Sequence, residues 1–464
     1  MINPQIFREY DIRGVAGKDL TEGVVTLLGG HFAQRVLLES VTTSQAPPLV
    51  VIARDGRLSS PSLASALAQG LVGRGVDVVD IGLAPTPALY FAAHHFQAAA
   101  GVMLTGSHNP PDHNGLKMVL NGRPFFGADI QDLGERVRMG FASAANVTGQ
   151  MRQESILETY VARVVRDFKP GRPIRVVMDC GNGATGVVAN EILHRLANVC
   201  GEVLFAEVDG RFPNHHPDPT VPKNLLHLQK RMQETEAQLG IAFDGDGDRI
   251  GALDENGEIL WGDRMMILFA RDLLKEHPGA TVIGDVKCSQ LLFDAIAKAG
   301  GVPLMWKTGH SLVKDKMRQT GALLGGEMSG HLFFADRYYG YDDALYAAVR
   351  LIELLAAQDS PLGVRLADLP KVFATPELRI FCADDVKFQV MERISLSQKA
   401  QGADLSDVDG IRVRDGDGWW LLRVSNTQPA LVVRIEAQSA EGLRLMAQRV
   451  AGILAQEGVA FPDL

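Results

Sequence analysis

The chain is 464 residues long, which is too long for one hydrophobic core, so we expect three or four domains. Its formal net charge of −9 argues against a general nucleic-acid-binding protein, although an acidic protein can still hold a local basic pocket for phosphates. There is no apolar run long enough to span a bilayer, no hydrophobic segment of a signal peptide and no CxxC pair among the four cysteines, so we expect a cytoplasmic protein with reduced thiols and no membrane contact.

The first forty residues combine basic and aromatic side chains with an amphipathic helix. Arg8, Tyr10 and Arg13 surround a short apolar segment, and apolar residues then recur at helical spacing over about 20–39. Arginines this close together either form a solvated surface or reach into a cleft.

A pattern of apolar strand, Asp-containing loop, amphipathic helix and second apolar strand occurs three times. Continuous apolar strands joined through a helix are typical of a βαβ unit with buried parallel strands. The repetition predicts three related α/β domains. The three units comprise strands at 49–53 and 76–81 around a helix at 60–73, strands at 174–178 and 203–206 around a helix at 186–198, and strands at 281–284 and 303–306 around a helix at 289–299.

The pattern changes after residue 370. Strand-like segments at 378–381, 411–413, 419–424 and 431–436 are joined by short turns, and a helix follows at 440–456. This arrangement predicts an α+β domain with an antiparallel sheet. The expected fold is therefore three related mixed α/β domains followed by a C-terminal α+β domain, around a central cleft, with domains at 1–152, 153–256, 257–370 and 371–464.

A polar hexapeptide, TGSHNP at 105–110, follows the apolar run at 102–104. We expect a tight, exposed turn in which Gly106 takes a backbone conformation that other residues avoid and Pro110 ends the strand. Ser107 on such a loop can accept and pass on a group, but an ordinary Ser/Asn/Pro turn is an open alternative. Side chains of sequence neighbours normally diverge, so Ser107 and His108 are not expected to form a hydrolase pair.

Three carboxylates, Asp244, Asp246 and Asp248, alternate with glycines directly after the strand-like run 239–242. They would repel one another unless a cation or arginines accompany them, and hard divalent cations prefer several oxygen ligands. An EF-hand is excluded because Arg249 stands where its glycine is required and because a strand precedes the loop. A plain Asp/Gly turn is the alternative. As ligands of magnesium, three carboxylates leave room for a substrate or phosphate oxygen.

Two further loops have the composition of ligand-binding sites. In 325–331, glycines bracket Glu327, Ser329 and His331, which suits hydrogen bonds to sugar hydroxyls, although a flexible loop with incidental polar residues is equally open. The segment 423–429 supplies an arginine, hydroxyls and loop amides, the donors that a phosphate monoester needs, or else it is a plain turn.

Three single polar residues, Lys117, Lys287 and His310, lie in glycine-containing loops. Each of them, taken alone, is expected at the surface.

Four motifs together resemble the α-D-phosphohexomutase superfamily in order and spacing, with one motif in each expected domain: TGSHNP at 105–110, DGDGDR at 244–249, GEMSGH at 326–331 and RVSNTQP at 423–429. The resemblance begins at IFREYDIRG (6–14) and covers essentially the whole chain. Met328 and Asn426 look like the bacterial phosphomannomutase/phosphoglucomutase branch, because phosphoglucosamine mutases usually have glutamine and glycine there. Gln428 departs from the threonine that is common in that branch.

The resemblance implies an intramolecular phosphotransferase that reversibly interconverts hexose 1-phosphate and hexose 6-phosphate, for mannose and glucose. It implies that Ser107 is a phosphoserine that joins the three aspartates around one Mg²⁺, with a 1,6-bisphosphate intermediate and glucose 1,6-bisphosphate as activator. It further implies a monomer whose partners are small hexose phosphates used for polysaccharide precursors. The implied catalytic residues are Ser107, Lys117, His108, Arg13, Arg249 and His310, of which Lys117 and His310 are the proton-transfer candidates.

Substrate recognition, by the same resemblance, divides between the sugar and its non-transferring phosphate. Glu327 and Ser329 would hold sugar hydroxyls. The full implied substrate-binding set is Tyr10, Lys287, Gly309, His310, Glu327, Ser329, His331, Arg423, Ser425, Asn426 and Thr427.

Three alternative functions stay open on the sequence. They are a phosphoglucosamine mutase, a magnesium-dependent sugar-phosphate binding protein that does no chemistry, and a phosphatase built on the three aspartates.

Overall fold

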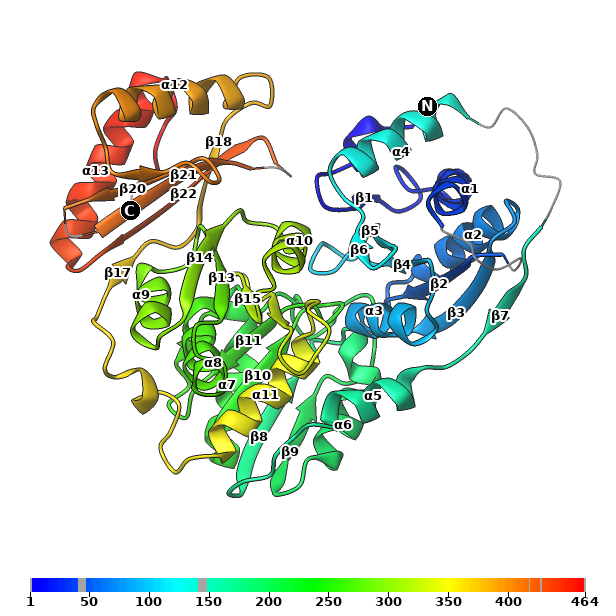
Figure 1. Cartoon of the computed structure of the whole chain (residues 1–464), viewed down its shortest axis with the longest axis horizontal. Helices are drawn as coiled ribbons and strands as arrows, with labels where there is room; N and C mark the ends of the chain where they lie inside the picture. The colour runs from blue at the N-terminus through cyan, green and yellow to red at the C-terminus, as the bar shows by residue number, and fades with distance from the viewer. Residues whose placement is uncertain (1, 41–46, 141–147, 417, 426–427, 463–464) are drawn as a thin grey trace.

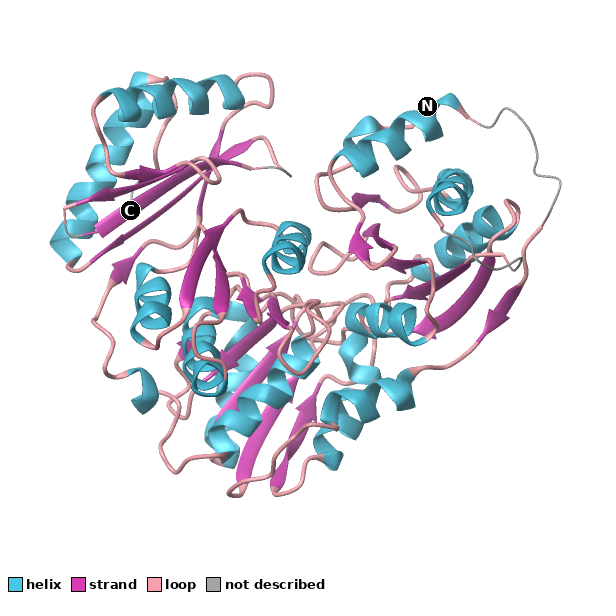
Figure 2. Ribbon diagram, viewed as in Figure 1, coloured by secondary structure: helices cyan, strands magenta, loops and turns pink. Residues whose placement is uncertain are grey.

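The computed structural model describes residues 2–40, 47–140, 148–416, 418–425 and 428–462. Within these ranges the chain forms four β-sheets in chain order, with helices packed on them (Figures 1 and 2). The sheets follow one another along an arc, so that the first and the last lie at its two ends (Figure 1). The first three sheets are mixed and the fourth is antiparallel, which confirms the predicted fold class.

The first three sheets share one arrangement of four strands. A central strand pairs in parallel with two neighbours, and one of these pairs antiparallel with the strand that follows it. The sets are β3 (Asp77–Leu83), β2 (Leu49–Arg54), β4 (Ala100–Leu104) and β5 (His113–Leu120); β9 (Val199–Leu204), β8 (Ile174–Asp179), β10 (Leu239–Phe243) and β11 (Ile250–Leu253); and β14 (Val302–Trp306), β13 (Thr281–Asp285), β15 (Leu324–Gly326) and β16 (Leu332–Phe334).

This shared arrangement positions the candidate site. The turn between the last two strands of each set holds one of the sequence motifs, at 105–112, 244–249 and 327–331. Equivalent turns of three related sheets therefore converge on one region.

The first sheet has additional edge strands and is covered by helices. α1 and α2 pack closely against each other on one side of it. The elements are η1 (Pro4–Ile6), β1 (Ile12–Val15), α1 (Glu22–Glu39), α2 (Ser60–Val72), α3 (Thr86–His95), β6 (Arg123–Pro124), α4 (Ala128–Met139) and β7 (Met151–Gln153).

One apolar core continues from the first sheet through the second and third. α11 (Ala344–Ala356) contacts strands of both the second and the third sheet, and it is buried along most of its length. The other elements here are α5 (Leu157–Val165), η2 (Ala184–Val187), α6 (Ala189–Arg195), η3 (Pro222–Leu225), α7 (Leu226–Thr235), β12 (Ile259–Leu260), α8 (Gly262–Glu276), α9 (Gln290–Lys298), α10 (His310–Thr320) and η4 (Val364–Leu366).

The second unit differs from the sequence prediction in two places. The helix expected at 186–198 is shorter, because the 3₁₀ turn η2 precedes α6. The strand expected at 203–206 is β9, which begins at Val199 and ends before Phe205, whose φ is 49°. β9 is an edge strand whose residues are partly buried or exposed, so it lacks the apolar run of a central strand. β12 also extends the second sheet beyond residue 256.

The last unit has a hydrophobic core of its own. A small apolar cluster that includes Val286, Trp419 and Leu421 joins it to the third unit. α12, which the sequence did not predict, covers the sheet together with α13. The elements are β17 (Phe373–Ala374), β18 (Leu378–Phe381), α12 (Lys387–Ala400), β19 (Leu405–Ser406), β20 (Ile411–Asp415), β21 (Gly418–Val424), β22 (Ala430–Ala437) and α13 (Ala440–Gln456).

None of the helices in the described ranges is both long enough and apolar enough to cross a membrane.

The contact between α1 and α2 gives the first prediction. A Cβ on Gly70 would lie 2.2 Å from the carbonyl oxygen of Thr26, so Gly70→Ala forces the helices apart, and such overpacking costs about 1–3 kcal/mol. Gly452→Ala in α13 is the matched control, because a Cβ there meets nothing within 4 Å and alanine favours a helix by about 1 kcal/mol. We expect calorimetry to give a lower unfolding midpoint for Gly70→Ala and an unchanged or higher one for Gly452→Ala. Equal midpoints would contradict this packing.

Candidate active site

A cleft of about 1760 Å³ is lined by residues from all four units. Its lining includes most of the residues that the sequence had assigned to substrate binding or to positive charge. The predicted site residues that line it are Tyr10, Arg13, His108, Arg249, Lys287, Gly309, His310, Glu327, Ser329, His331, Arg423 and Ser425.

Ser107 and the three aspartates are buried beside this cleft. Ser107 is 1% exposed and donates a hydrogen bond from Oγ to Asp244 Oδ2 at 2.6 Å. Carboxylate oxygens of Asp244, Asp246 and Asp248 lie within 4.8 Å of one another. The expectation of an exposed turn at 105–110 is wrong at Thr105, Gly106 and Ser107, which are buried. The aspartate loop of the second unit packs against Ser107, and Thr105 donates to Asp55.

The backbone of the Ser107 loop also differs from the prediction. The left-handed conformation falls on Ser107 itself, with a φ of 49°, and not on Gly106. Such a conformation costs a residue with a side chain about 1–2 kcal/mol. Gly106 is needed for space instead, since a Cβ there would lie 2.5 Å from the guanidinium carbon of Arg57.

His108 turns toward Ser107, although neighbouring side chains were expected to diverge. Its Nδ1 lies 3.1 Å from Ser107 Oγ, at a point where Ser107 has a left-handed φ of 49°. Burial, followed by Arg249 and Arg13, holds the pKa of His108 well below its usual range. Burial, followed by Asp246 and Asp248, raises the pKa of Asp244 well above its usual range. The serine hydroxyl therefore lies between an imidazole that stays neutral and a carboxyl that resists ionisation.

Lys117 supplies positive charge to the aspartates. It was expected at the surface, but it is 3% exposed, and its Nζ donates to Asp246 Oδ2 at 2.7 Å and also to Asp248 Oδ2. Burial opposes its charge, but Asp246 and Asp248 raise the pKa of Lys117, so the ammonium form persists.

The aspartate loop is built to receive a cation. Asp246 Oδ1 and Asp248 Oδ1 are buried and have no hydrogen-bond partner among the described residues. Backbone N–H groups of Gly247, Asp248 and Arg249 donate to the other oxygen of Asp244, at 3.0–3.2 Å. Mg²⁺ prefers oxygen ligands, and here carboxylate oxygens that accept no hydrogen bond from the described residues lie close together.

Gly245 allows the aspartate loop to reach the serine. A Cβ on Gly245 would lie 2.4 Å from the carbonyl oxygen of Ser107. Any other residue at this position would separate the two loops and break the contact between Ser107 and Asp244.

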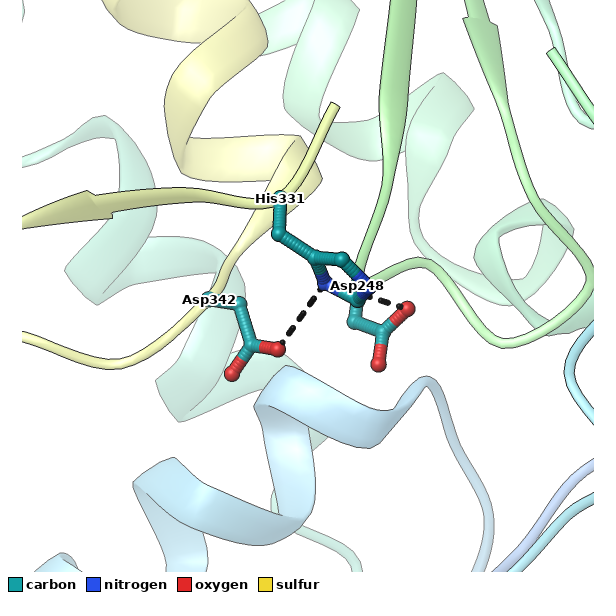
Figure 3. Close-up of side chains that lie close together, drawn as sticks. All are labelled: Asp248, His331 and Asp342. Atoms are coloured by element: carbon teal, nitrogen blue, oxygen red, sulfur yellow. Dashed lines mark ion pairs between the residues drawn. The ribbon is translucent and has the colours of Figure 1, made fainter. Parts of the chain in front are cut away.

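A second close group, formed by Asp248, His331 and Asp342, is explained without a second metal (Figure 3). Arg249 Nε donates to His331 Nε2 at 2.9 Å, so the ring proton is on Nδ1. Nδ1 faces Asp342 Oδ2 at 3.1 Å and Asp248 at 3.8 Å (Figure 3). An Nδ1 that carries a proton has no lone pair for a metal, and it faces the carboxylates of Asp342 and Asp248 at ion-pair distances.

His310 is buried as well, and its expected surface position is wrong. Its ring stacks on that of His331, with centroids 5.3 Å apart. Burial, followed by the charge of Lys314, holds the pKa of His310 well below its usual range. His310 Nδ1 has no hydrogen-bond partner among the described residues.

The GEMSGH loop is ordered around Glu327. The backbone N–H of Gly309 donates to Glu327 Oε1, and Ser329 Oγ donates to Oε2 at 3.3 Å. Gly309 has a φ of 138°, and a Cβ there would lie 2.6 Å from the ring of Tyr10. Tyr10, Gly309 and Glu327 thus form one continuous wall of the cleft.

The last unit forms a basic wall of the cleft. Arg423 pairs with Asp409 at 2.9 Å, and Lys287 of the third unit pairs with Glu377 at 3.0 Å. Lys387 Nζ donates to the carbonyl oxygen of Ser425 at 2.8 Å. Two predicted members of this wall, Asn426 and Thr427, lie outside the described residues. His331, which was expected to help bind the phosphate, lines the cleft and contacts Arg249 and Asp342 beside the aspartate loop.

Sequence reasoning missed several residues that hold the site together. Arg57 and Asp55 support the Ser107 loop, and Thr86 Oγ1 donates to Asp246. Asp342 and Asp409 hold His331 and Arg423. The sequence did hold a sign of Asp55, because an aspartate ends or directly follows the first apolar strand of each repeated unit, at 55, 179 and 285.

Comparisons with known proteins cover the whole length of the chain. Profiles described as phosphoglucomutase/phosphomannomutase, alpha/beta/alpha domains I, II and III, match residues 4–140, 158–257 and 261–373, and the profile of the C-terminal domain matches 377–453. The phosphomannomutase/phosphoglucomutase of Pseudomonas putida is 46% identical over 435 residues, covering 94% of this chain and 92% of that protein.

Two further relatives agree with this match. The phosphoglucomutase of Neisseria gonorrhoeae is 42% identical, covering 98% of this chain and 97% of that protein. A crystal structure of a phosphoglucomutase/phosphomannomutase family protein from Burkholderia thailandensis is 43% identical and superposes with a TM-score of 0.91, covering 99% of this chain and 100% of that chain.

Removing the ammonium group of Lys117 tests its role as counter-charge. Lys117→Met leaves buried carboxylates without their cation, which costs about 3–5 kcal/mol for a broken buried pair. We expect a lower unfolding midpoint in EDTA than for the parent protein and a larger rise on addition of Mg²⁺. The deficit should become smaller as the pH falls, because Asp244, whose pKa is raised, takes up a proton.

The matched control is Lys230→Met, because the side chain of Lys230 is 76% exposed. This variant should behave like the parent protein in both conditions. If Lys117→Met and Lys230→Met have the same midpoints in EDTA, Lys117 does not balance the aspartates.

Proposed function

Because this chain belongs to the phosphoglucomutase/phosphomannomutase family of α-D-phosphohexomutases, we propose that it interconverts the 1-phosphates and 6-phosphates of mannose and glucose. The reaction passes through a phosphoserine at Ser107 and a hexose 1,6-bisphosphate. One observation carries the proposal: the buried hydroxyl of Ser107 lies 2.6 Å from Asp244, within a cluster of three aspartates beside a large cleft. A group on Ser107 Oγ is thereby placed between a cation site and the space for a sugar.

Mg²⁺ is the cation that these residues fit. Asp244, Asp246 and Asp248 would hold it together with a phosphoryl oxygen on Ser107, and the two unpartnered carboxylate oxygens support this assignment. When bound, Mg²⁺ supplies Lewis-acid neutralisation of charge on the transferring phosphoryl group.

The protein's own cations surround the same point. Arg13 donates to Asn109 Oδ1 at 3.0 Å, and Arg249 lines the cleft next to His331. Arg13 and Arg249 stabilise negative charge as the phosphoryl group moves, and His108 provides a hydrogen bond beside Ser107 Oγ.

Two residues move protons in this proposal. The sugar hydroxyl that attacks the phosphoserine loses its proton, and His310 is neutral at pH 7 and lines the cleft, so its imidazole accepts that proton. In this proposal Lys117, which keeps its proton among the aspartates, returns one to Ser107 Oγ when the bond from phosphorus to that oxygen breaks.

The substrate is held by two walls. Glu327 and Ser329 take sugar hydroxyls, and the basic wall takes the phosphate that is not being transferred. Its residues, with Asn426 and Thr427 assigned from the family motif alone, are Tyr10, Lys287, Arg423, Ser425, Asn426 and Thr427.

The bisphosphate must bind in two opposite orientations, so that Ser107 gives a phosphoryl group to one end of the sugar and takes one back from the other. The separate core of the last unit supports a movement that lets the intermediate turn without release. In this proposal the protein is a cytoplasmic monomer, and glucose 1,6-bisphosphate is its activator.

An assay of the purified protein with Mg²⁺ and a trace of glucose 1,6-bisphosphate tests this function. We expect isomerisation of mannose 1-phosphate and glucose 1-phosphate, and a loss of at least about 1000-fold in kcat for Ser107→Ala, because the phosphoryl acceptor is gone. Ser62→Ala, at an exposed serine on α2, should retain full activity.

Each alternative has its own outcome in the same assay. Turnover of glucosamine 1-phosphate alone would overturn the substrate assignment. Bulk release of inorganic phosphate would indicate a phosphatase. Binding of hexose phosphates without turnover, unchanged in Ser107→Ala, would indicate a binding protein.

A further inference from the structure

We propose that Arg57 is the positioning residue that fixes the Ser107 loop for phosphoryl transfer, an inference that rests on the proposed function. Arg57 lies three residues after the end of β2, and its side chain has no exposed surface. The cleft is lined by His108 and Asn109 of the loop, whereas Arg57 is not among the described residues that line it. Arg57 therefore acts on the reaction through the residues that it holds in place, and not by contact with the substrate.

The guanidinium group of Arg57 uses all of its hydrogen-bond donors. A guanidinium has five N–H donors in a planar fork, and five acceptors surround this one. Nε donates to Asp55 Oδ2 at 3.1 Å, and the other four donors reach backbone carbonyl oxygens of the loop. The four are Ser107 O at 2.7 Å, Asn109 O at 2.7 Å, His113 O at 2.9 Å and Pro110 O.

Asp55 extends the support to the start of the loop. Its carboxylate accepts from Thr105 Oγ1 at 2.8 Å and from the backbone N–H of Gly106 at 3.2 Å. Thr105 Oγ1 in turn accepts from the backbone N–H of Ser107 at 2.8 Å. The ion pair of Arg57 and Asp55 thus forms hydrogen bonds along the loop from Thr105 to His113. Most of these bonds are to backbone groups, and one is to the Thr105 hydroxyl, which in turn binds the backbone of Ser107.

This support opposes the strain at Ser107. Ser107 has a left-handed φ in the conformation that brings its Oγ to Asp244, and this φ is energetically unfavourable. The hydrogen bond from Arg57 to the carbonyl oxygen of Ser107 stabilises the same residue in that conformation. A loop that relaxes by about 1 Å would lose alignment with the sugar, which costs a rate factor on the order of 100.

Residues of the second unit pack on Arg57 from the other side. The ring of Phe212 lies 5.3 Å from the guanidinium carbon, and a Cβ on Gly210 would lie 2.5 Å from the Cα of Arg57. Arg57 therefore also fixes the first unit to the unit that carries Asp244. The distance between Ser107 Oγ and Asp244 depends on this contact.

Arg57→Lys tests the proposal, because an ammonium has only three donors for the five acceptors. We expect kcat to fall by about 10- to 100-fold, while KM for glucose 1-phosphate stays within about threefold, since no substrate contact is lost. Hydrogen exchange in peptides spanning 105–113 should become faster.

Arg365→Lys is the matched control. Arg365 also donates to four backbone carbonyl oxygens, those of Leu354, Leu355, Gln358 and Ser360, but far from the Ser107 loop in sequence and outside the cleft lining. It should lose thermal stability without any change in kcat or in exchange at 105–113. If Arg57→Lys does not fold, Gly106→Ala replaces it, because its Cβ displaces the guanidinium and leaves the charge, with the same expected fall in kcat.

Three outcomes would overturn the proposal. They are a kcat for Arg57→Lys that falls no further than that of Arg365→Lys, a rise in KM with kcat unchanged, and unchanged exchange at 105–113. Absence of turnover in the parent protein would instead overturn the proposed function, and the exchange comparison alone would then decide whether Arg57 fixes the loop.

Discussion

Three aspartate carboxylates meet within 4.8 Å of one another inside the protein, and their mutual repulsion governs the rest of the site. Burial makes the repulsion strong, so charge of the opposite sign has to come from elsewhere in the fold. Lys117 brings an ammonium from the first unit, and backbone N–H groups of the aspartate loop bind one carboxyl. Two carboxylate oxygens still have no donor among the described residues, which leaves the place for a divalent cation. Ser107 meets the cluster from a loop that another buried ion pair, Arg57 with Asp55, holds in a strained conformation.

The repeated architecture explains how such distant residues meet. The same turn, between a parallel strand and its antiparallel neighbour, carries the serine in the first unit, the aspartates in the second and Glu327 in the third. These three units share one apolar core and form a rigid base for chemistry. The last unit has its own core and supplies the basic wall. The separation of the first three units from the last unit suits the proposed reaction. One phosphate is transferred at a fixed point, while the sugar has to turn between two orientations.

Sequence reasoning succeeded where the signal was local. The three strand–helix–strand units, the antiparallel last sheet and the motif in each unit follow from apolar runs and from glycine-rich polar loops. It failed where a partner distant in the chain decides the outcome. Lys117 and His310 were expected at the surface, but each is buried against a residue that is distant in the sequence. Lys117 binds Asp246, and His310 stacks on His331. Gly106 was assigned a backbone role, but its small size leaves space for Arg57, 49 residues earlier in the chain. The edge strand β9 and the helix α12 were misplaced or missed because neither has the apolar pattern of a central element.

The central claim is that Ser107 carries the phosphoryl group. The most direct measurement incubates the protein with Mg²⁺ and glucose 1,6-bisphosphate labelled with ³²P, and then locates the label by proteolysis and mass spectrometry. The account predicts a stoichiometric phosphoserine at Ser107, which transfers its label to hexose phosphate when unlabelled glucose 1-phosphate is added. Label on any other residue, or isomerisation by a protein that never acquires label at Ser107, would contradict it.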